Sequence, residues 1–152
     1  MARYPVVVYG ASGYTGMLIM DWLIDQQIPF TAVARHAGRV RELMAQRVVR
    51  LESATYEIVE AEHTVESLAK AFTGARVVCN TVGPFVNLGL TTVEAALRAG
   101  CHYIDTTGEQ AHIRAVRDRF GASYAQAGLL VSPSIAYMYT FAEIAAELAL
   151  ET

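Results

Sequence analysis

The chain has 152 residues, of which 53% are hydrophobic and 18% are charged, and its formal net charge at pH 7 is −3. This length and composition are typical of one ordinary globular domain, and they exclude a disordered or fibrous segment. The 12 lysine and arginine residues are scattered along the chain, so the sequence indicates no basic surface for nucleic acid or an anionic membrane.

No segment has the features of a leader or of a membrane span. The amino terminus passes from Met1 to the valines at Val6 and Val7 without the basic and apolar regions of a signal peptide. No window approaches about 18 uninterrupted apolar residues. Both cysteines, Cys79 and Cys101, lie in apolar segments without metal-ligand spacing, which favours reduced, buried thiols. We therefore expect a cytoplasmic protein with no metal site.

Clusters of β-forming residues alternate with segments of helical spacing along the chain. The clusters predict six strands, at 6–9, 30–34, 56–60, 76–81, 102–106 and 129–132. The other segments predict six helices, at 15–27, 39–48, 65–72, 90–99, 109–127 and 139–150. Strict alternation with nearly all-apolar strands indicates a parallel sheet covered by helices on both faces. The predicted fold class is α/β, a doubly wound sheet with strand order 3-2-1-4-5-6.

A glycine-rich turn with the sequence GASGYTG joins the first predicted strand to the first predicted helix. Gly10 allows a tight turn, Gly13 leaves room for a pyrophosphate, and Gly16 lets the helix pack close to the strand. Backbone N–H groups at such a helix start bind anions at the positive end of the helix dipole. The GxxGxxG spacing is a weak signal alone, but this position predicts a dinucleotide site rather than a structural turn.

The end of the second predicted strand carries an arginine where an NAD site usually carries an acid. That acid, about 20 residues after the glycine loop, binds the ribose 2′-hydroxyl. Arg35 stands there instead, with His36 and Arg39 as neighbours. A guanidinium binds the 2′-phosphate of NADP by bidentate, charge-assisted hydrogen bonds. The sequence therefore predicts NADP rather than NAD, and a solvated loop arginine is the alternative.

Two further segments follow the fourth and fifth predicted strands, on the ligand side of a doubly wound sheet. We expect the loop at Gly83 and Pro84 to lie along the cofactor, although a plain turn explains each residue equally well. Asp105 is the candidate to orient a substrate amine or a second domain. We interpret Glu109 as a first-turn acid favoured by the dipole of its own helix. The remaining histidines have no partners at metal-ligand spacing and are interpreted as structural or exposed: His63, His102 and His112.

The last predicted helix, 139–150, carries an apolar stripe that includes Phe141, Ile144 and Leu148 and needs a cover. We expect that cover to be a lost partner, a second subunit of a homodimer, or the sheet itself. A dinucleotide-type sheet without a region for a substrate indicates one piece of a longer enzyme. Residues 1–152 are therefore predicted to form a dinucleotide-binding domain whose substrate domain lies outside this sequence.

Four segments together resemble the amino-terminal domain of the saccharopine dehydrogenase-like family, which includes trans-acting enoyl reductases. They are GASGYTG, ARHAGRVREL, ARVVCNTVGPF followed by Gly89, and AGCHYIDTTGE. The resemblance spans residues 5 to about 135, and its VGP loop with YIDTTGE is more specific than the glycine turn. By resemblance, the NADP-binding positions are Gly10, Ser12, Gly13, Tyr14, Thr15, Arg35, Thr81, Val82 and Gly83.

The resemblance implies hydride transfer between C4 of the nicotinamide and a C=N, C=O or C=C bond of a small-molecule substrate. Substrate contacts in the family come largely from a second domain, so no catalytic residue is carried over, and Asp105 stays the one candidate. As an isolated piece, the chain is expected to bind NADPH and to turn over nothing.

Other functions are compatible with parts of the sequence. GASGYTG is also similar to the first loop of acyl-phosphate and semialdehyde reductases, which need an exposed nucleophilic cysteine near a histidine. Neither Cys79 nor Cys101 has the surrounding motif of those enzymes. Short-chain dehydrogenases need Tyr-x-x-x-Lys, and the only lysine, Lys70, has no tyrosine four residues before it. A non-catalytic NADP-binding sensor would carry the same dinucleotide motifs.

Overall fold

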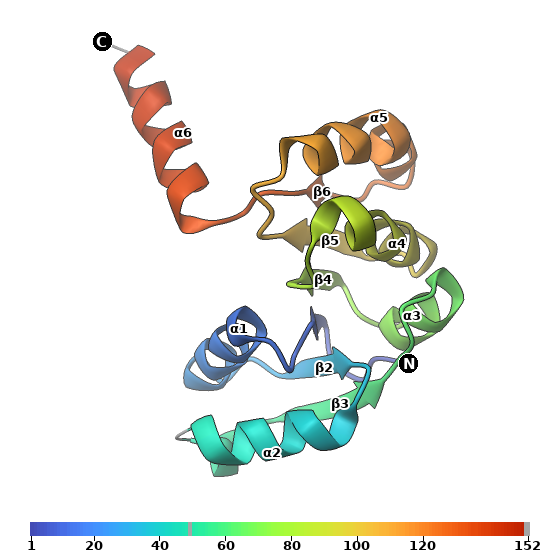
Figure 1. The fold of residues 1–152 in the computed structure, drawn as a ribbon, viewed down its shortest axis with the longest axis vertical. Coiled ribbons are helices and arrows are strands. Elements are labelled where there is room, and N and C mark those ends of the chain that lie inside the picture. The colour runs from blue at the N-terminus through green and yellow to red at the C-terminus, as the bar shows by residue number, and fades with distance from the viewer. Residues whose placement is uncertain (49, 151–152) are drawn as a thin grey trace.

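Strands and helices alternate along the computed structural model, which describes residues 1–48 and 50–150 (Figure 1). The strands are β1 (Val6–Tyr9), β2 (Phe30–Ala34), β3 (Tyr56–Glu60), β4 (Val77–Asn80), β5 (His102–Asp105) and β6 (Val131–Ser132). The helices are α1 (Tyr14–Asp25), α2 (Ala37–Arg47), α3 (Val65–Phe72), α4 (Phe85–Arg98), α5 (Gln110–Gln126) and α6 (Tyr137–Leu150). A 3-10 turn lies at Leu51–Ser53. The predicted continuation past Thr152 lies outside the described residues.

All strands in the described part of the chain run parallel in one sheet, in the order β3-β2-β1-β4-β5-β6. The predicted fold class and strand order are therefore confirmed. Successive side chains of β1 enter two separate cores: Val7 and Tyr9 pack with α3, α4 and α5, whereas Val8 packs with α1 and α2. This alternation explains why the strands are apolar at nearly every position. Fully burying one such side chain stabilises the fold by about 1.5–3 kcal/mol.

The predicted element boundaries agree with the structure to within two residues, with one exception. Helix α4 begins at Phe85, whereas the sequence predicted a start at residue 90. The prediction was wrong because the start is stabilised from elsewhere in the chain. The two carboxylate oxygens of Glu109 accept hydrogen bonds from the backbone N–H groups of Phe85 at 2.8 Å and of Val86 at 2.7 Å. Pro84 is therefore the residue before a helix rather than part of a long loop, and its peptide bond with Gly83 is cis.

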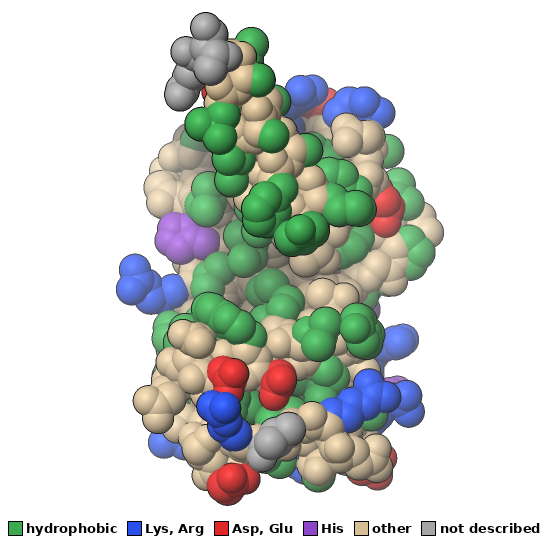
Figure 2. Space-filling view, turned by 90° about the vertical axis from the view of Figure 1, so that its left-hand side faces the viewer, with side chains coloured by type: hydrophobic (Ala, Val, Ile, Leu, Met, Phe, Trp, Pro, Cys, Tyr) green, Lys and Arg blue, Asp and Glu red, His purple; other side chains and the backbone are tan. Residues whose placement is uncertain are grey.

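Helix α6 projects away from the sheet (Figure 1). Its stripe residues Phe141, Ile144 and Leu148 are 60%, 52% and 60% exposed, and Figure 2 shows hydrophobic side chains along its surface. The stripe does not pack on the sheet, so the expectation that the sheet covers it is wrong. The first turn of α6 contacts the loop after β5: the Tyr139 hydroxyl lies so close to Gly108 that a Cβ at that glycine would overlap it. Among the described residues, no helix has the length and hydropathy needed to cross a membrane.

Candidate functional site

The glycine turn brings the loop after β1 against the loop after β4. Gly10 has φ +92°, a left-handed conformation that favours glycine, and a Cβ there would lie 2.5 Å from the Thr81 Oγ1 atom. The Thr81 hydroxyl donates to the Tyr9 carbonyl at 2.9 Å. A Cβ at Gly16 would overlap the Gly10 carbonyl oxygen. The predicted roles of Gly10 in a tight turn and of Gly16 in close helix packing are therefore confirmed, and the role of Gly13 stays a prediction.

The first turn of α1 is open to solvent. Gly13 precedes the helix without a side-chain cap, and the first turn contains no acidic residue. No side chain in the described part of the chain accepts a hydrogen bond from the N–H groups of Ser12, Tyr14 or Thr15. Helix starts leave such donors unsatisfied and carry a partial positive charge. This turn therefore has the geometry of an anion site.

A cavity of about 300 Å³ lies beside the glycine turn. Seven of the predicted cofactor-binding residues line it: Gly10, Ser12, Gly13, Arg35, Thr81, Val82 and Gly83. The other four lie outside its walls. Tyr14 is 75% exposed on the surface of α1, and Gly16 is buried beneath the turn. Thr15 lines a different cavity, and Pro84 is exposed at the start of α4. His36 and Arg39, the predicted neighbours of Arg35, are also exposed and do not line this cavity.

The polar groups of this cavity differ in how far they are satisfied. Arg35 is exposed, and its guanidinium makes no hydrogen bond or ion pair with a described residue. His63 also lines the cavity, and its Nδ1 atom lies 2.8 Å from the Tyr9 hydroxyl. The sequence did not assign His63 to this site. The available signal was its position just after the third strand, at the ligand edge of the sheet.

A second cavity, of about 590 Å³, lies beyond the first turn of α1. Thr15 and Ile19 of α1 form one wall, and Cys79 and Ile104 of β4 and β5 form another. Burial raises the pKa of the Cys79 thiol to about 11, and the nearby charge of Asp105 acts in the same direction. Burial also raises the pKa of Cys101 to about 11. Both cysteines are free and buried, as predicted, and neither has the lowered pKa of a nucleophilic thiol.

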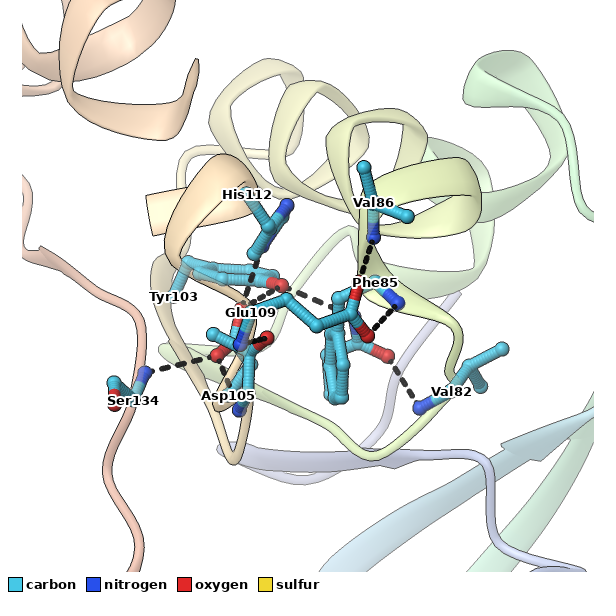
Figure 3. Close-up of polar contacts among 10 residues, drawn as sticks. Val82, Phe85, Val86, Tyr103, Asp105, Glu109, His112 and Ser134 are labelled. Atoms are coloured by element: carbon cyan, nitrogen blue, oxygen red, sulfur yellow. Dashed lines mark hydrogen bonds and ion pairs between the residues drawn. The ribbon is translucent and has the colours of Figure 1, made fainter. Parts of the chain in front are cut away.

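Asp105, the candidate catalytic residue, is fully buried in a hydrogen-bond network (Figure 3). Its Oδ2 atom accepts from the Tyr103 hydroxyl at 2.8 Å and from Nε2 of His112 at 2.9 Å. Its Oδ1 atom accepts from the backbone N–H groups of Thr107 and Ser134, each at 3.0 Å. Burial alone would raise the pKa of Asp105, but these hydrogen bonds outweigh burial and lower the pKa below 3.8. The carboxylate is thus ionised and internally satisfied, and a catalytic role for it stays a prediction.

The same network reaches the loop after β4. The Tyr103 hydroxyl accepts from the Asn80 side-chain amide at 3.0 Å, and the Asn80 Oδ1 atom accepts from the Val82 N–H at 2.9 Å. Val82 lines the smaller cavity. The position of the cavity wall therefore depends on contacts that begin at Asp105. The sequence did not indicate this connection.

Glu109, His102 and His112 contact other parts of the fold and do not line the smaller cavity. Glu109 precedes α5, but its carboxylate closes the first turn of α4, so the interpretation that it serves its own helix is wrong. His112 is buried beside α4, where a Cβ at Gly89 would overlap its ring. His102 accepts from the Leu130 N–H at 2.9 Å. The described residues contain no group of histidine, cysteine and acidic side chains able to hold a metal ion.

Comparisons with known proteins agree with this architecture. The family model described as "Saccharopine dehydrogenase NADP binding domain" matches residues 6–130. The lipid droplet localized protein of Caenorhabditis elegans is 31% identical over 138 residues, which cover 86% of this chain and 32% of that protein. The trans-acting enoyl reductase of Mycobacterium bovis is 33% identical over 134 residues, which cover 83% of this chain and 30% of that protein. The chain thus spans about a third of the length of the curated relatives it matches.

Two solved structures share the fold at low identity. The NADPH-dependent quinone oxidoreductase of Escherichia coli, complexed with NADPH, has a TM-score of 0.55 and 17% identity, over 84% of this chain and 47% of that one. The binary complex of leucoanthocyanidin reductase and NADPH from Vitis vinifera has a TM-score of 0.57 and 15% identity, over 84% and 48%. At these identities, the likeness concerns the fold alone.

Proposed function

The chain belongs to the family of saccharopine dehydrogenase NADP-binding domains, and from this premise we propose that it positions the nicotinamide of NADP for hydride transfer. The observation that carries the proposal is the place of the Arg35 side chain. Its guanidinium has no partner among the described residues, and it lines the same cavity as the glycine turn. An arginine in this position suits a phosphate on the adenosine ribose, which is the group that distinguishes NADP from NAD.

We propose that the dinucleotide extends across the carboxyl edge of the sheet. The pyrophosphate lies at the first turn of α1, which carries no acid, and where the N–H groups of Ser12, Tyr14 and Thr15 have no acceptor among the described residues. The adenosine half lies in the smaller cavity, with its 2′-phosphate on Arg35. The nicotinamide half then points past Thr15 toward the larger cavity. This arrangement uses the groups that the fold leaves without partners.

The cofactor supplies the hydride at C4 of its nicotinamide, and the protein supplies binding and orientation. The proposed substrate is a small molecule with a C=N, C=O or C=C bond. Similarity to a protein named trans-acting enoyl reductase supports a place among oxidoreductases and favours the C=C bond. We place most substrate contacts in a second domain outside this sequence, and the greater length of the curated relatives supports this. A cytoplasmic location and a homodimer are kept as proposals, supported by the free cysteines and the uncovered stripe of α6.

The test compares two cofactors on the wild type and on Arg35→Ala by calorimetric titration, with the fluorescence of Trp22 as a second signal. We expect Arg35→Ala to weaken NADPH binding by about ten- to a hundredfold, because a charge-assisted hydrogen bond contributes roughly 1.5–3 kcal/mol. NADH binding should be nearly unchanged. Arg41→Ala, an exposed arginine on α2, is the matched control and should bind both cofactors as the wild type does.

Two outcomes would contradict the proposal. If Arg35→Ala weakened NADPH and NADH equally, Arg35 would not contact the 2′-phosphate. If the folded wild type bound no NADPH at millimolar concentration, the proposed function itself would fail.

A further inference from the structure

His63 occupies a wall of the cavity that the proposed function assigns to the adenosine half of NADP. It lies in the loop between β3 and α3, and the ring is held from behind by Tyr9 of β1. The Tyr9 hydroxyl and His63 Nδ1 are 2.8 Å apart. The two ring planes are only 7° from parallel, with centroids 6.1 Å apart. Tyr9 is 2% exposed and packs against Phe72, so its position is set by the core and it fixes the imidazole in turn.

The cavity contains few flat surfaces. Tyr9 is almost entirely covered, and Arg35 is assigned to a phosphate. The remaining lining residues are glycines and serine, alanine, threonine, valine or leucine side chains. His63 is therefore the one partly exposed aromatic side chain that lines the cavity within residues 1–48 and 50–150. A purine gains most from a flat aromatic partner, because every base has a π-face.

The position of Arg35 determines which part of the dinucleotide reaches His63. The 2′-phosphate and the adenine are attached to the same ribose, so a cofactor whose phosphate contacts Arg35 carries its purine into the same cavity of about 300 Å³. That volume is at the lower end of small-molecule pockets and suits part of a dinucleotide rather than all of it. We propose that His63 recognises the adenine: its imidazole, fixed by the Tyr9 hydroxyl, is the wall against which the purine stacks. This inference rests on the proposed function.

The protonation states of the pair agree with that role. Burial raises the pKa of Tyr9 to about 12, although the charge of Arg35 opposes this. The hydroxyl therefore stays protonated within hydrogen-bond distance of Nδ1. Burial lowers the pKa of His63, the Leu88 backbone opposes that shift, and the charge of Arg35 adds to it. The imidazole is thus neutral near pH 7, and stacking a purine on it desolvates no charge.

The experiment titrates the wild type, His63→Ala and His63→Phe with NADPH and with NADH. His63→Ala should weaken both cofactors by the same factor, about five- to a hundredfold, which corresponds to the loss of one base–aromatic contact. His63→Phe should keep most of the affinity, because it restores a flat ring. Adenosine 2′,5′-bisphosphate, which has no nicotinamide, should show the same pattern. His102→Ala, a histidine outside the cavity, is the matched control and should leave both affinities unchanged.

Each result separates the inference from the proposed function. If the wild type binds NADPH and His63→Ala binds it equally well, the adenine assignment is overturned and the proposed function stands. A loss confined to NADPH would also overturn it, since His63 would then act on the 2′-phosphate. A loss as large in His63→Phe as in His63→Ala would overturn stacking, provided circular dichroism shows both variants folded. If the folded wild type does not bind NADPH, the proposed function fails first.

Discussion

Two helices begin at the carboxyl edge of the same sheet. They differ in what accepts the hydrogen bonds of their first N–H groups. At α4, the N–H groups of Phe85 and Val86 both donate to the carboxylate of Glu109. At α1, the first turn has no acid and no side-chain cap. At α4 the protein itself accepts these hydrogen bonds, whereas the first turn of α1 has the geometry of an anion site.

The charged side chains near these two helices follow the same division. Asp105, on the α4 side, is fully buried and accepts four hydrogen bonds. Arg35, on the α1 side, is exposed and has no partner among the described residues. On the α1 side, the Arg35 guanidinium and the N–H groups of the helix start face solvent beside a cavity, where an anion can replace water. We infer that the hydrogen-bond network of Asp105 holds the domain together, whereas Arg35 is free to contact the adenosine half of the cofactor. Asp105 also lines the larger cavity, toward which the nicotinamide half is proposed to point. Four predictions test this division.

The largest expected effect is on the stability of Asp105→Ala. The change leaves the buried Tyr103 hydroxyl and His112 imidazole without their acceptor, and we expect a loss of about 3–5 kcal/mol in the free energy of unfolding. Urea denaturation measures it. Asp118→Ala removes an acid from an exposed ion pair with Arg117 on the same side of the sheet and should change stability by less than about 1 kcal/mol. A similar small change in Asp105→Ala would contradict the division.

Glu109→Ala should have the next largest effect. It leaves the N–H groups of Phe85 and Val86 without an acceptor at the start of α4, and loss of a helix cap costs about 0.5–2 kcal/mol. Thermal denaturation monitored by circular dichroism measures it. Glu143, an exposed acid on α6, provides the control variant Glu143→Ala. If the two variants melted together, the carboxylate of Glu109 would not stabilise α4.

Acidification should act through Asp105 as well. Its pKa in the folded protein lies below the ordinary 3.8, so its contribution to stability is fully present above that value. The contribution is lost as the pH falls from 3.8 through the folded pKa. Unfolding free energies measured from pH 7 to pH 3 should therefore fall more steeply for the wild type than for Asp105→Asn. Parallel curves would mean that the carboxylate is not selectively stabilised in the folded state.

The smallest effect on stability is expected at Arg35. Because its guanidinium has no partner among the residues that the structure describes, Arg35→Ala should change the free energy of unfolding by less than about 0.5 kcal/mol, although we expect it to weaken NADPH binding. Urea denaturation without cofactor measures this. A loss comparable to that of Glu109→Ala would show that Arg35 supports the fold, and the distinction between the two sides would no longer hold.

Local patterns in the sequence determined the fold class, the strand order, the bounds of α3 and three glycines of the cavity wall, Gly10, Gly13 and Gly83. These features follow from the spacing of apolar residues and from glycines next to a strand, which act over a few neighbouring positions. Three further residues of the same wall were predicted only by resemblance to the family: Ser12, Thr81 and Val82. Arg35 was also predictable, because the end of the second strand is a defined position in this fold class.

Only the tertiary structure decided where α4 begins, that Asp105 is internally satisfied, and that His63 reaches the cavity. The hydrogen bond from Phe85 to Glu109 joins residues 24 positions apart, and the one from Ser134 to Asp105 joins residues 29 apart. The contact between Tyr9 and His63 spans 54 positions. A contact between distant segments leaves no periodic pattern in either one, so its partners become visible only when the sheet brings them to one edge.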